Sequence, residues 1–151
     1  MSFRVFNLGP SIDRAIQEAE YVEPTPIQAA AIPKILAGHD VIGIAQTGTG
    51  KTAAFVLPVL AQLVSKPPKG VAKTTRALIL APTRELAVQI EESVRLYSQY
   101  LSLKAVAVYG GVGEQPQIRG LRNRVDLVIA TPGRLLDLME QGHANFSGLE
   151  F

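Results

Sequence analysis

Short apolar runs alternate with longer segments of helical periodicity along this chain. The runs are rich in Val, Ile, Leu and Ala and have the length of buried strands. In the segments between them, apolar residues recur every three or four positions, as Leu86, Ile90 and Val94 do. This alternation predicts an α/β fold in which helices flank a mostly parallel sheet. The expected strands are residues 40–45, 77–81, 105–109 and 126–130, and the helices expected to follow them are 50–64, 83–100, 114–122 and 131–141.

Two more helical segments, residues 11–20 and 26–37, precede the first expected strand. They predict an N-terminal helical annex. The second segment begins with a capping box, in which Thr25 is the N-cap, Pro26 takes the first helical position and Gln28 follows three residues after the cap.

Composition limits the kind of protein that this chain can be. It has 151 residues, 47% of them apolar, so we expect one domain over 1–151, with the annex in 1–38 and the α/β core in 39–151. The absence of cysteine and the presence of two histidines exclude a disulfide framework and a thiolate or histidine-cluster metal site. A formal charge of +2 is too small to predict a polyanionic partner by itself.

Residues 1–10 carry no apolar run typical of a secretory leader. The apolar stretch 53–64 is shorter than the ~20 residues of a membrane helix, so we expect no membrane segment.

Residues 45–52 have the pattern of a phosphate-binding loop. They read Ala-Gln-Thr-Gly-Thr-Gly-Lys-Thr, follow the first expected strand and begin a helix. The glycines let backbone amides point inward, Lys51 can reach the outer phosphates, and the hydroxyl of Thr52 can bind Mg²⁺. Ala45 stands where the general pattern has glycine. The alternative interpretation is a Gly/Thr-rich turn without a ligand.

Two other strand-to-helix junctions carry residues suited to phosphates. Residues 83–86 and 131–134 follow expected strands and look locally like ordinary helix starts. In an open parallel sheet such junctions meet at the carboxyl edge, where helix N-termini and arginines present hydrogen-bond donors. A string of phosphates fits there.

The chain resembles the DEAD-box RNA helicase family over essentially its whole length. Five motifs agree in order and spacing. Residues 24–28, Pro-Thr-Pro-Ile-Gln, resemble the Q motif, and Phe3 lies where the family has an isolated upstream aromatic. Residues 45–52 resemble motif I, including the alanine that departs from the general pattern. Pro-Thr-Arg-Glu-Leu-Ala at 82–87 resembles motif Ia, Gly110-Gly111 the paired glycines, and Thr-Pro-Gly-Arg at 131–134 motif Ib.

The resemblance implies a RecA-like fold and an ATP or ADP site with Mg²⁺. Gln28 would read the adenine edge and Phe3 would stack on the base, which favours ATP over GTP, whereas Phe6 is expected in the core. Lys51 and Thr52 would take catalytic roles, and Thr52 would be a metal ligand. The residues expected at the nucleotide are Phe3, Gln28, Gln46, Thr47, Gly48, Thr49, Gly50, Lys51 and Thr52.

The other motifs imply contact with single-stranded or short duplex RNA. They would hold the sugar-phosphate backbone, so binding should depend on salt and little on base sequence. The residues expected at the RNA are Pro82, Thr83, Arg84, Gly110, Gly111, Thr131, Pro132, Gly133 and Arg134.

The remaining charged residues and histidines are not expected to take part in catalysis or metal binding. Glu91 and Glu92 are adjacent on an expected helix and point apart, so they do not form a catalytic pair. Residues 65–75 lack periodicity and are expected to form a surface loop, although their lysines, Lys66, Lys69 and Lys73, are an alternative RNA contact. The histidines His39 and His143 are expected in loops.

By the resemblance, the chain is the amino-terminal domain of a helicase, and it ends before an Asp-Glu-Ala-Asp motif. The parent would be a monomeric cytoplasmic protein of bacterial type, with a second RecA-like domain. We expect these 151 residues alone neither to hydrolyse ATP nor to unwind RNA, because positioning and charge stabilisation dominate phosphoryl transfer. Two alternatives stay open: a stand-alone nucleotide or RNA-binding module without enzymatic activity, and another phosphate-loop protein such as a nucleotide kinase or GTPase. Against the second stand Gln28 and the lack of an Asn-Lys-x-Asp sequence.

Overall fold

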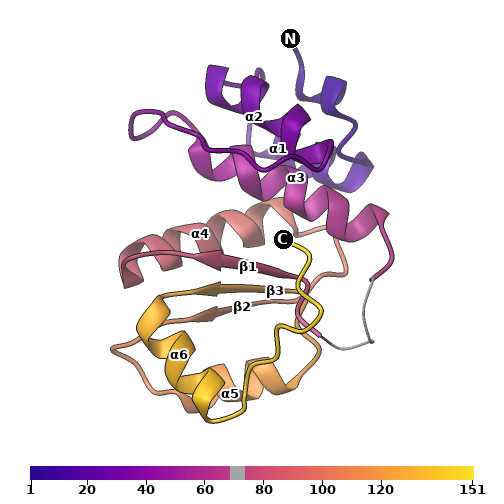
Figure 1. Cartoon of the computed structure of the whole chain (residues 1–151). Coiled ribbons are helices and arrows are strands. Elements are labelled where there is room, and N and C mark those ends of the chain that lie inside the picture. Colours follow the sequence, from indigo (N-terminus) through magenta and orange to yellow (C-terminus); the bar gives the residue numbers. More distant parts are fainter. Residues whose placement is uncertain (69–73) are drawn as a thin grey trace. The chain divides into compact units, whose positions relative to one another are not determined.

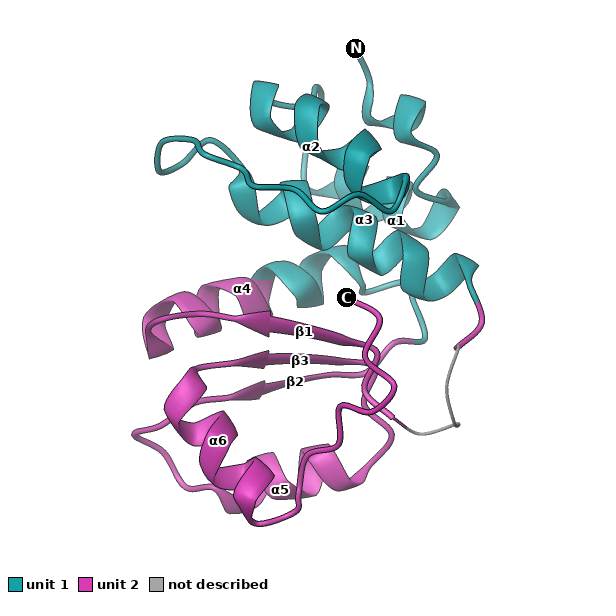
Figure 2. Ribbon diagram, in the orientation of Figure 1, with its two compact units in different colours: residues 1–66, 93–102 teal, residues 67–92, 103–151 magenta. Residues whose placement is uncertain are grey.

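The computed structural model describes residues 1–68 and 74–151. They fall into two compact units, which Figure 2 shows in different colours. Unit 1 contains residues 1–66 and 93–102, and unit 2 contains residues 67–92 and 103–151. Each unit buries apolar side chains of its own. The predicted boundary between residues 38 and 39 stays a prediction.

Unit 1 is built from helices. A 3₁₀ turn, η1 (Phe3–Phe6), is followed by α1 (Pro10–Glu18), α2 (Pro26–Leu36) and α3 (Lys51–Ser65), as Figure 1 shows. The inward faces of α1 and α2 carry Ile12, Ile16 and Ile32, which are all buried. α3 is buried along most of its length and packs against α2. The predicted annex and the helix after the phosphate loop are therefore confirmed, whereas η1 was not predicted.

Side-chain hydrogen bonds support both ends of α2. At its start, Thr25 N donates to Gln28 Oε1 at 3.0 Å, as the predicted capping box requires. At its end, the side chain of Gln62 from α3 donates through Nε2 to the carbonyl oxygens of Ile35, at 2.9 Å, and Leu36, at 3.0 Å. Gln62 is 3% exposed, so these bonds are made away from water. Leu36 O is one of the carbonyls that a helix leaves unpaired at its last turn, and Ile35 O also accepts from Gly38 N.

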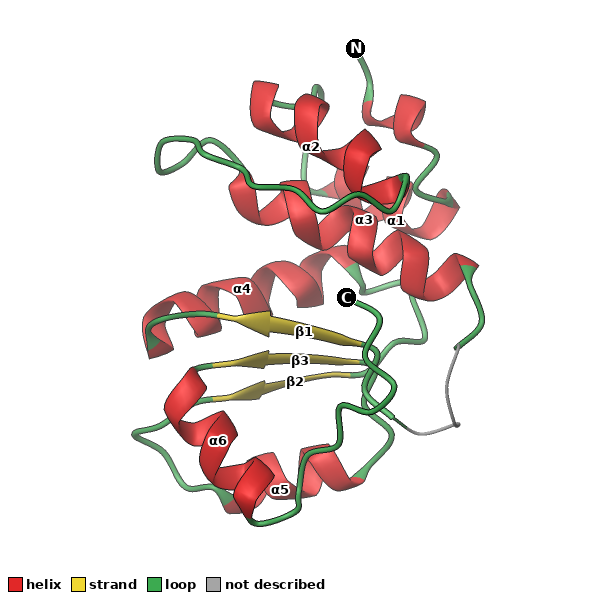
Figure 3. Ribbon diagram, in the orientation of Figure 1, coloured by secondary structure: helices red, strands yellow, loops and turns green. Residues whose placement is uncertain are grey.

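Unit 2 contains a parallel sheet of the strands β1 (Ala77–Leu80), β2 (Ala105–Val108) and β3 (Leu127–Ala130). The strand order is β1-β3-β2, and Ala77 and Ala105 both pair with Leu127. Figure 3 shows the sheet in yellow beside its helices. The predicted α/β class and three of the predicted strands are confirmed. β3 is the inner strand, and all four of its residues are buried.

Helices lie on both sides of this sheet. The helices are α4 (Arg84–Tyr97), whose residues 84–92 belong to unit 2, α5 (Gln115–Arg122) and α6 (Pro132–Glu140). The chain moves from β1 past β3 to β2 through α4 and returns to β3 through α5. Right-handed crossovers therefore require α4 and α5 on opposite faces, which Figure 1 shows.

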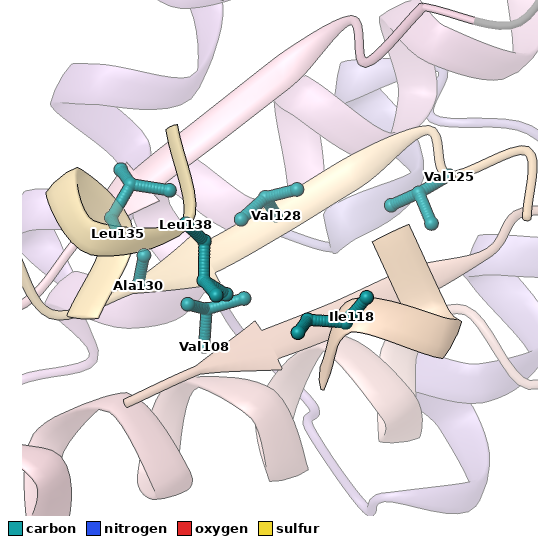
Figure 4. Close-up of a cluster of buried hydrophobic side chains, with 7 residues drawn as sticks. All are labelled: Val108, Ile118, Val125, Val128, Ala130, Leu135 and Leu138. Atoms are coloured by element: carbon teal, nitrogen blue, oxygen red, sulfur yellow. The ribbon is translucent and has the colours of Figure 1, made fainter. Parts of the chain in front are cut away.

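One apolar cluster joins α5 and α6 to the sheet. Figure 4 shows Val108, Val128 and Ala130 from the strands pointing toward Ile118 of α5 and Leu138 of α6. Because strand side chains alternate between faces, Leu127 and Ile129 point to the other side of the sheet. They are equally buried. A continuous apolar run on β3 is thus explained by burial on both faces.

Residues 150 and 151 run along the second edge of β1. Leu78 N donates to Phe151 O at 3.0 Å, and the amides of Glu150 and Phe151 donate to Arg76 O. The side chains of Arg76 and Glu150 form an ion pair that is largely buried. β1 therefore has hydrogen-bond partners on both edges.

The prediction of a buried strand at residues 40–45 was wrong. Residues 39–46 adopt no regular secondary structure, and Ile42 and Ile44 are 93% and 90% exposed. A parallel strand forms only where a neighbouring strand takes its backbone hydrogen bonds. Within residues 1–68 and 74–151, no strand pairs with this run, so its apolar sequence alone does not produce a strand.

The connection after α3 contains two of the lysines considered as RNA contacts outside the described residues. α3 ends at Ser65, where the predicted surface loop begins. Lys66 lies in the described part of that loop, but Lys69 and Lys73 lie outside the described residues. In the part of the chain that the structure describes, no helix combines the length and the apolar character needed to cross a membrane.

Replacing Gln62 by alanine should destabilise unit 1. The Gln62→Ala variant loses both bonds to the end of α2 inside the core, so we expect the free energy of unfolding to fall by about 1–3 kcal/mol. Urea denaturation followed by circular dichroism measures it. Gln99→Ala is the matched control, because Gln99 Nε2 also donates to a helix carbonyl, Leu96 O at 3.2 Å, but is exposed. Equal losses in the two variants would contradict this role.

Candidate nucleotide and RNA sites

The predicted phosphate loop is a tight turn directly before α3. Gly48 and Gly50 have φ of +81° and +85°, which glycine adopts without a steric penalty. Thr49 Oγ1 donates to Gln46 O at 2.6 Å and closes the turn. The first backbone hydrogen bond of α3 runs from Ala54 N to Gly50 O, so the amides of residues 51–53 have no partner within the helix. Such amides are suited to an anion.

Lys51 and Thr52 take the first two positions of α3. The ammonium group of Lys51 is exposed and donates to Ala45 O at 2.6 Å, across the loop. A phosphate would bind this ammonium group more strongly than the carbonyl does, because donor and acceptor would then both be charged. The hydroxyl of Thr52, on a half-buried side chain, is an oxygen ligand of the kind that Mg²⁺ prefers. Across residues 1–68 and 74–151, no three His, Cys, Asp or Glu side chains cluster as a metal site.

Gln28 connects the annex to the phosphate loop. Its side chain is 3% exposed; Oε1 accepts from Thr25 N, and Nε2 donates to Gly50 O at 3.1 Å. A carboxamide has a second N–H and a second acceptor position on its oxygen. These remaining positions are what Gln28 would offer to an adenine ring.

The close approach of Gln28 also explains why residue 50 is glycine. A Cβ atom built on Gly50 would collide with Gln28 Nε2. Gly50 therefore meets two requirements, a left-handed backbone and room for the amide. Gly48 meets only the first, because a Cβ atom there has no neighbour within 4 Å.

Phe3 lies in an aromatic cluster of unit 1. It is 3% exposed, and its ring centroid is 6.1 Å from that of Phe6 and 6.3 Å from that of Tyr21. The hydroxyl of Tyr21 is 3.0 Å from that of Tyr97, and burial together with this hydrogen bond raises the pKa of Tyr97. Phe6 is buried, as predicted. The ring of Phe3 packs against Phe6 and Tyr21 of this cluster, so its stacking on a base stays a prediction.

In unit 2, the three segments predicted to bind RNA follow the carboxyl ends of β1, β2 and β3. Thr83 precedes α4, and its Oγ1 accepts from Leu86 N at 3.2 Å; Thr131 is the N-cap of α6. Thr131 N donates to Val108 O, which ties the end of β3 to β2. The exposed members of the set at this edge are Pro82, Thr83, Arg84, Gly111, Pro132 and Gly133, and the half-buried ones are Gly110, Thr131 and Arg134.

Arg84 is held beside the paired glycines. Its Cζ atom lies 5.4 Å from the ring centroid of Tyr109, within the range of a cation–π interaction. Gly111 has φ +82°, and a Cβ atom there would lie 2.9 Å from Arg84 Nη1. A side chain at residue 111 would therefore displace the guanidinium group.

Arg134 is held by α5 and by the loop after the glycines. Nη1 donates to Gln117 Oε1 at 3.1 Å, and Nη2 donates to Val112 O at 3.0 Å. Gln117 Nε2 in turn donates to Tyr109 O at 2.9 Å. Motif residues from three segments are thus connected at one edge of the sheet.

Sequence reasoning missed Tyr109, Val112 and Gln117. Gln117 carried a usable signal, because it precedes Ile118 and lies four positions before Leu121, on the apolar side of a predicted amphipathic helix. A polar residue at such a position requires a hydrogen-bond partner. The partners themselves come from another helix and loop, and local periodicity does not reveal them.

Known proteins resemble this chain in sequence and in fold. The sequence model of the DEAD/DEAH box helicase family matches residues 25–151. The chain belongs to this family. The match includes Gln28, the phosphate loop and all three segments predicted to bind RNA.

Individual DEAD-box proteins match almost the whole chain. DEAD-box ATP-dependent RNA helicase 30 of Arabidopsis thaliana is 46% identical over 99% of this chain, and ATP-dependent RNA helicase DeaD of Mycobacterium tuberculosis is 43% identical over 99%. The chain spans 25% and 26% of these relatives' lengths. A hypothetical ATP-dependent RNA helicase from Sulfolobus tokodaii, solved by crystallography, matches with a TM-score of 0.80 and 37% identity, over 91% of this chain and 38% of that one. The fold is RecA-like, as predicted.

Alanine substitutions at Gly48 and Gly50 separate the effect of the left-handed backbone from the effect of a collision with Gln28. We expect Gly48→Ala to lower the free energy of unfolding by about 1–2 kcal/mol, the cost of a left-handed non-glycine residue. Gly50→Ala should lower the free energy of unfolding further, because its methyl group also collides with Gln28 Nε2. Urea denaturation without nucleotide measures both.

The extra cost at residue 50 should depend on Gln28. In a Gln28→Ala background, the loss in free energy of unfolding caused by Gly50→Ala should fall to that caused by Gly48→Ala, because the colliding amide is gone. If the extra cost persisted in that background, the collision would not be its cause.

Proposed function

We propose that the chain binds an adenine nucleotide and the backbone of single-stranded RNA as the amino-terminal part of an ATP-dependent RNA helicase. The hydrogen bond from Gln28 to Gly50 O carries this proposal. It places a buried carboxamide, the side chain suited to an adenine edge, against the last glycine of the phosphate loop. A general phosphate-loop protein has no need of that contact.

At the nucleotide, Lys51 would leave Ala45 O and bind the outer phosphates. The amides of residues 51–53 would add donors at the start of α3, and Gln46, Thr47, Gly48 and Thr49 would surround the phosphates. Thr52 would provide one oxygen ligand to Mg²⁺, and the phosphates would provide others. When bound, the ion would neutralise charge on the phosphates.

At the RNA, the exposed edge of unit 2 offers two arginines and two helix N-termini. Arg84 and Arg134 would pair with phosphates, and the amides at the starts of α4 and α6 would bind others. Gly110, Gly111 and Gly133 let the strand approach the protein backbone closely.

Hydrolysis and strand separation are proposed for a complete protein with a second RecA-like domain. The names of the Arabidopsis and Mycobacterium relatives support this, although the chain matches only about a quarter of each. We propose that the parent is a monomeric cytoplasmic enzyme and that these 151 residues bind without turnover. RNA-stimulated phosphate release by the purified chain would contradict the last point.

Titration with fluorescent ADP and Mg²⁺ tests the nucleotide site. Gln28→Ala and Lys51→Ala should each weaken binding about tenfold or more, as the loss of a hydrogen bond to a charged or buried group implies. GDP should compete poorly. Lys104→Ala, an exposed lysine of unit 2, is the control for Lys51 and should bind as the unmodified chain does. Equal competition by GDP and ADP would contradict adenine recognition.

Salt dependence tests the RNA edge. For a fluorescent single-stranded oligouridine, Arg84→Ala should lower the slope of log affinity against log salt by about 0.7, the loss of one phosphate contact. Arg124→Ala should leave the slope unchanged, since Arg124 is exposed but precedes β3, at the opposite edge of the sheet. If Arg124→Ala lowered the slope as much as Arg84→Ala, RNA would not be bound at the proposed edge.

A further inference from the structure

Gln117 is a buried polar residue on α5 whose two hydrogen-bonding ends are both used. It is 6% exposed, Nε2 donates to Tyr109 O and Oε1 accepts from Arg134 Nη1. A buried amide with partners at both ends is fixed in one orientation. Gln117 therefore links the end of β2 to the first turn of α6.

The same network holds both sides of the paired glycines. Tyr109 O, just before Gly110, is bound by Gln117, and Val112 O, just after Gly111, is bound by Arg134. Glycines add little stiffness of their own, so the path of this loop depends on its flanking anchors. One anchor is Gln117 itself, and the other is the arginine that Gln117 orients.

A third connection runs through the ring of Tyr109. Arg84 lies over that ring, with its Nη1 atom next to Gly111. Holding the backbone of Tyr109 therefore also positions the residue whose ring contacts Arg84. Directly or through one neighbour, Gln117 contacts each of the three segments proposed to bind RNA.

We propose that Gln117 is a positioning residue for RNA binding, which holds Arg84, Gly110-Gly111 and Arg134 as one preformed phosphate-binding edge without touching RNA. This inference rests on the proposed RNA role of that edge. Groups that are already ordered lose less conformational freedom on binding, so affinity is higher. Because Gln117 is uncharged and buried, its loss should lower affinity without changing the number of counterions released.

The test compares Gln117→Met with Gln115→Met in the 151-residue chain. Gln115 is exposed at the first position of the same helix, which makes it a matched control. With fluorescent single-stranded oligouridine over a range of KCl concentrations, Gln117→Met should bind about tenfold more weakly with the salt slope of the unmodified chain. Gln115→Met should bind normally. Arg84→Ala provides the reference for a residue that does change the slope.

A second measurement follows the loop without RNA. The amide NMR signals of Gly110, Gly111 and Gly113 should shift or broaden in Gln117→Met, while those of Val128 and Ile129 in β3 stay in place. If the β3 signals were also lost, the Gln117→Met variant would not be folded, and Gln117→Glu would be used in its place. A carboxylate still accepts from Arg134 but cannot donate to Tyr109 O. The loop signals should change in that variant too.

Two results would overturn the inference: unchanged glycine signals with RNA affinity within about twofold of the unmodified chain, or a salt slope reduced as in Arg84→Ala. If the unmodified chain bound no RNA, the proposed function would fail, and the glycine signals would still decide whether Gln117 holds the loop.

Discussion

Parallel pairing to β3 is the constraint on which the arrangement of unit 2 depends. β1 and β2 do not pair with each other, and both bond to β3 in the same direction. The carboxyl ends of all three strands therefore lie at one edge, and each is followed by a segment rich in glycine, threonine or arginine. Since β3 is buried on both faces, its hydrogen bonds form away from water. The strands therefore hold the backbone at this common edge, from which the exposed side chains extend, in a fixed position.

In unit 1, a single side chain has the corresponding role. Gln28 lies in the first turn of α2 and takes part in capping that helix, while its other end binds the phosphate loop through Gly50 O. A capping interaction and the group proposed to recognise adenine thus share one carboxamide. This explains why a sequence that reads locally as an ordinary capping box also carries functional information. The buried environment fixes the orientation that an adenine edge would meet.

Much of this structure was accessible from the sequence because it depends on local patterns. Helix starts at Pro26 and Pro132 follow from capping chemistry, and the buried run at β3 follows from its apolar composition. The run at residues 40–45 has a similar composition but is exposed, since a parallel strand requires a partner that its own residues do not specify.

The functional sites divide in the same way. The phosphate loop and the segments after the strands were predicted from their residue pattern and from the expected strands before them, whereas the proposed role of Gln28 came from the resemblance to DEAD-box helicases. Gln117 and Tyr109 were not predicted, because their importance lies in contacts with residues distant in sequence, such as Arg134 and Arg84. Phe3 shows the opposite case, in which a motif position is identified but the side chain is packed inside an aromatic cluster.

Gln28 joins the annex to the phosphate loop, and we propose that the site they form binds adenine nucleotides. Calorimetric titration of ADP and Mg²⁺ into a Gln28→Glu variant tests it most directly. A glutamate can still accept from Thr25 N and start α2, but it cannot donate to Gly50 O. Helicity by circular dichroism should be unchanged, and ADP affinity should fall about tenfold or more. Unchanged ADP affinity in this variant would contradict it.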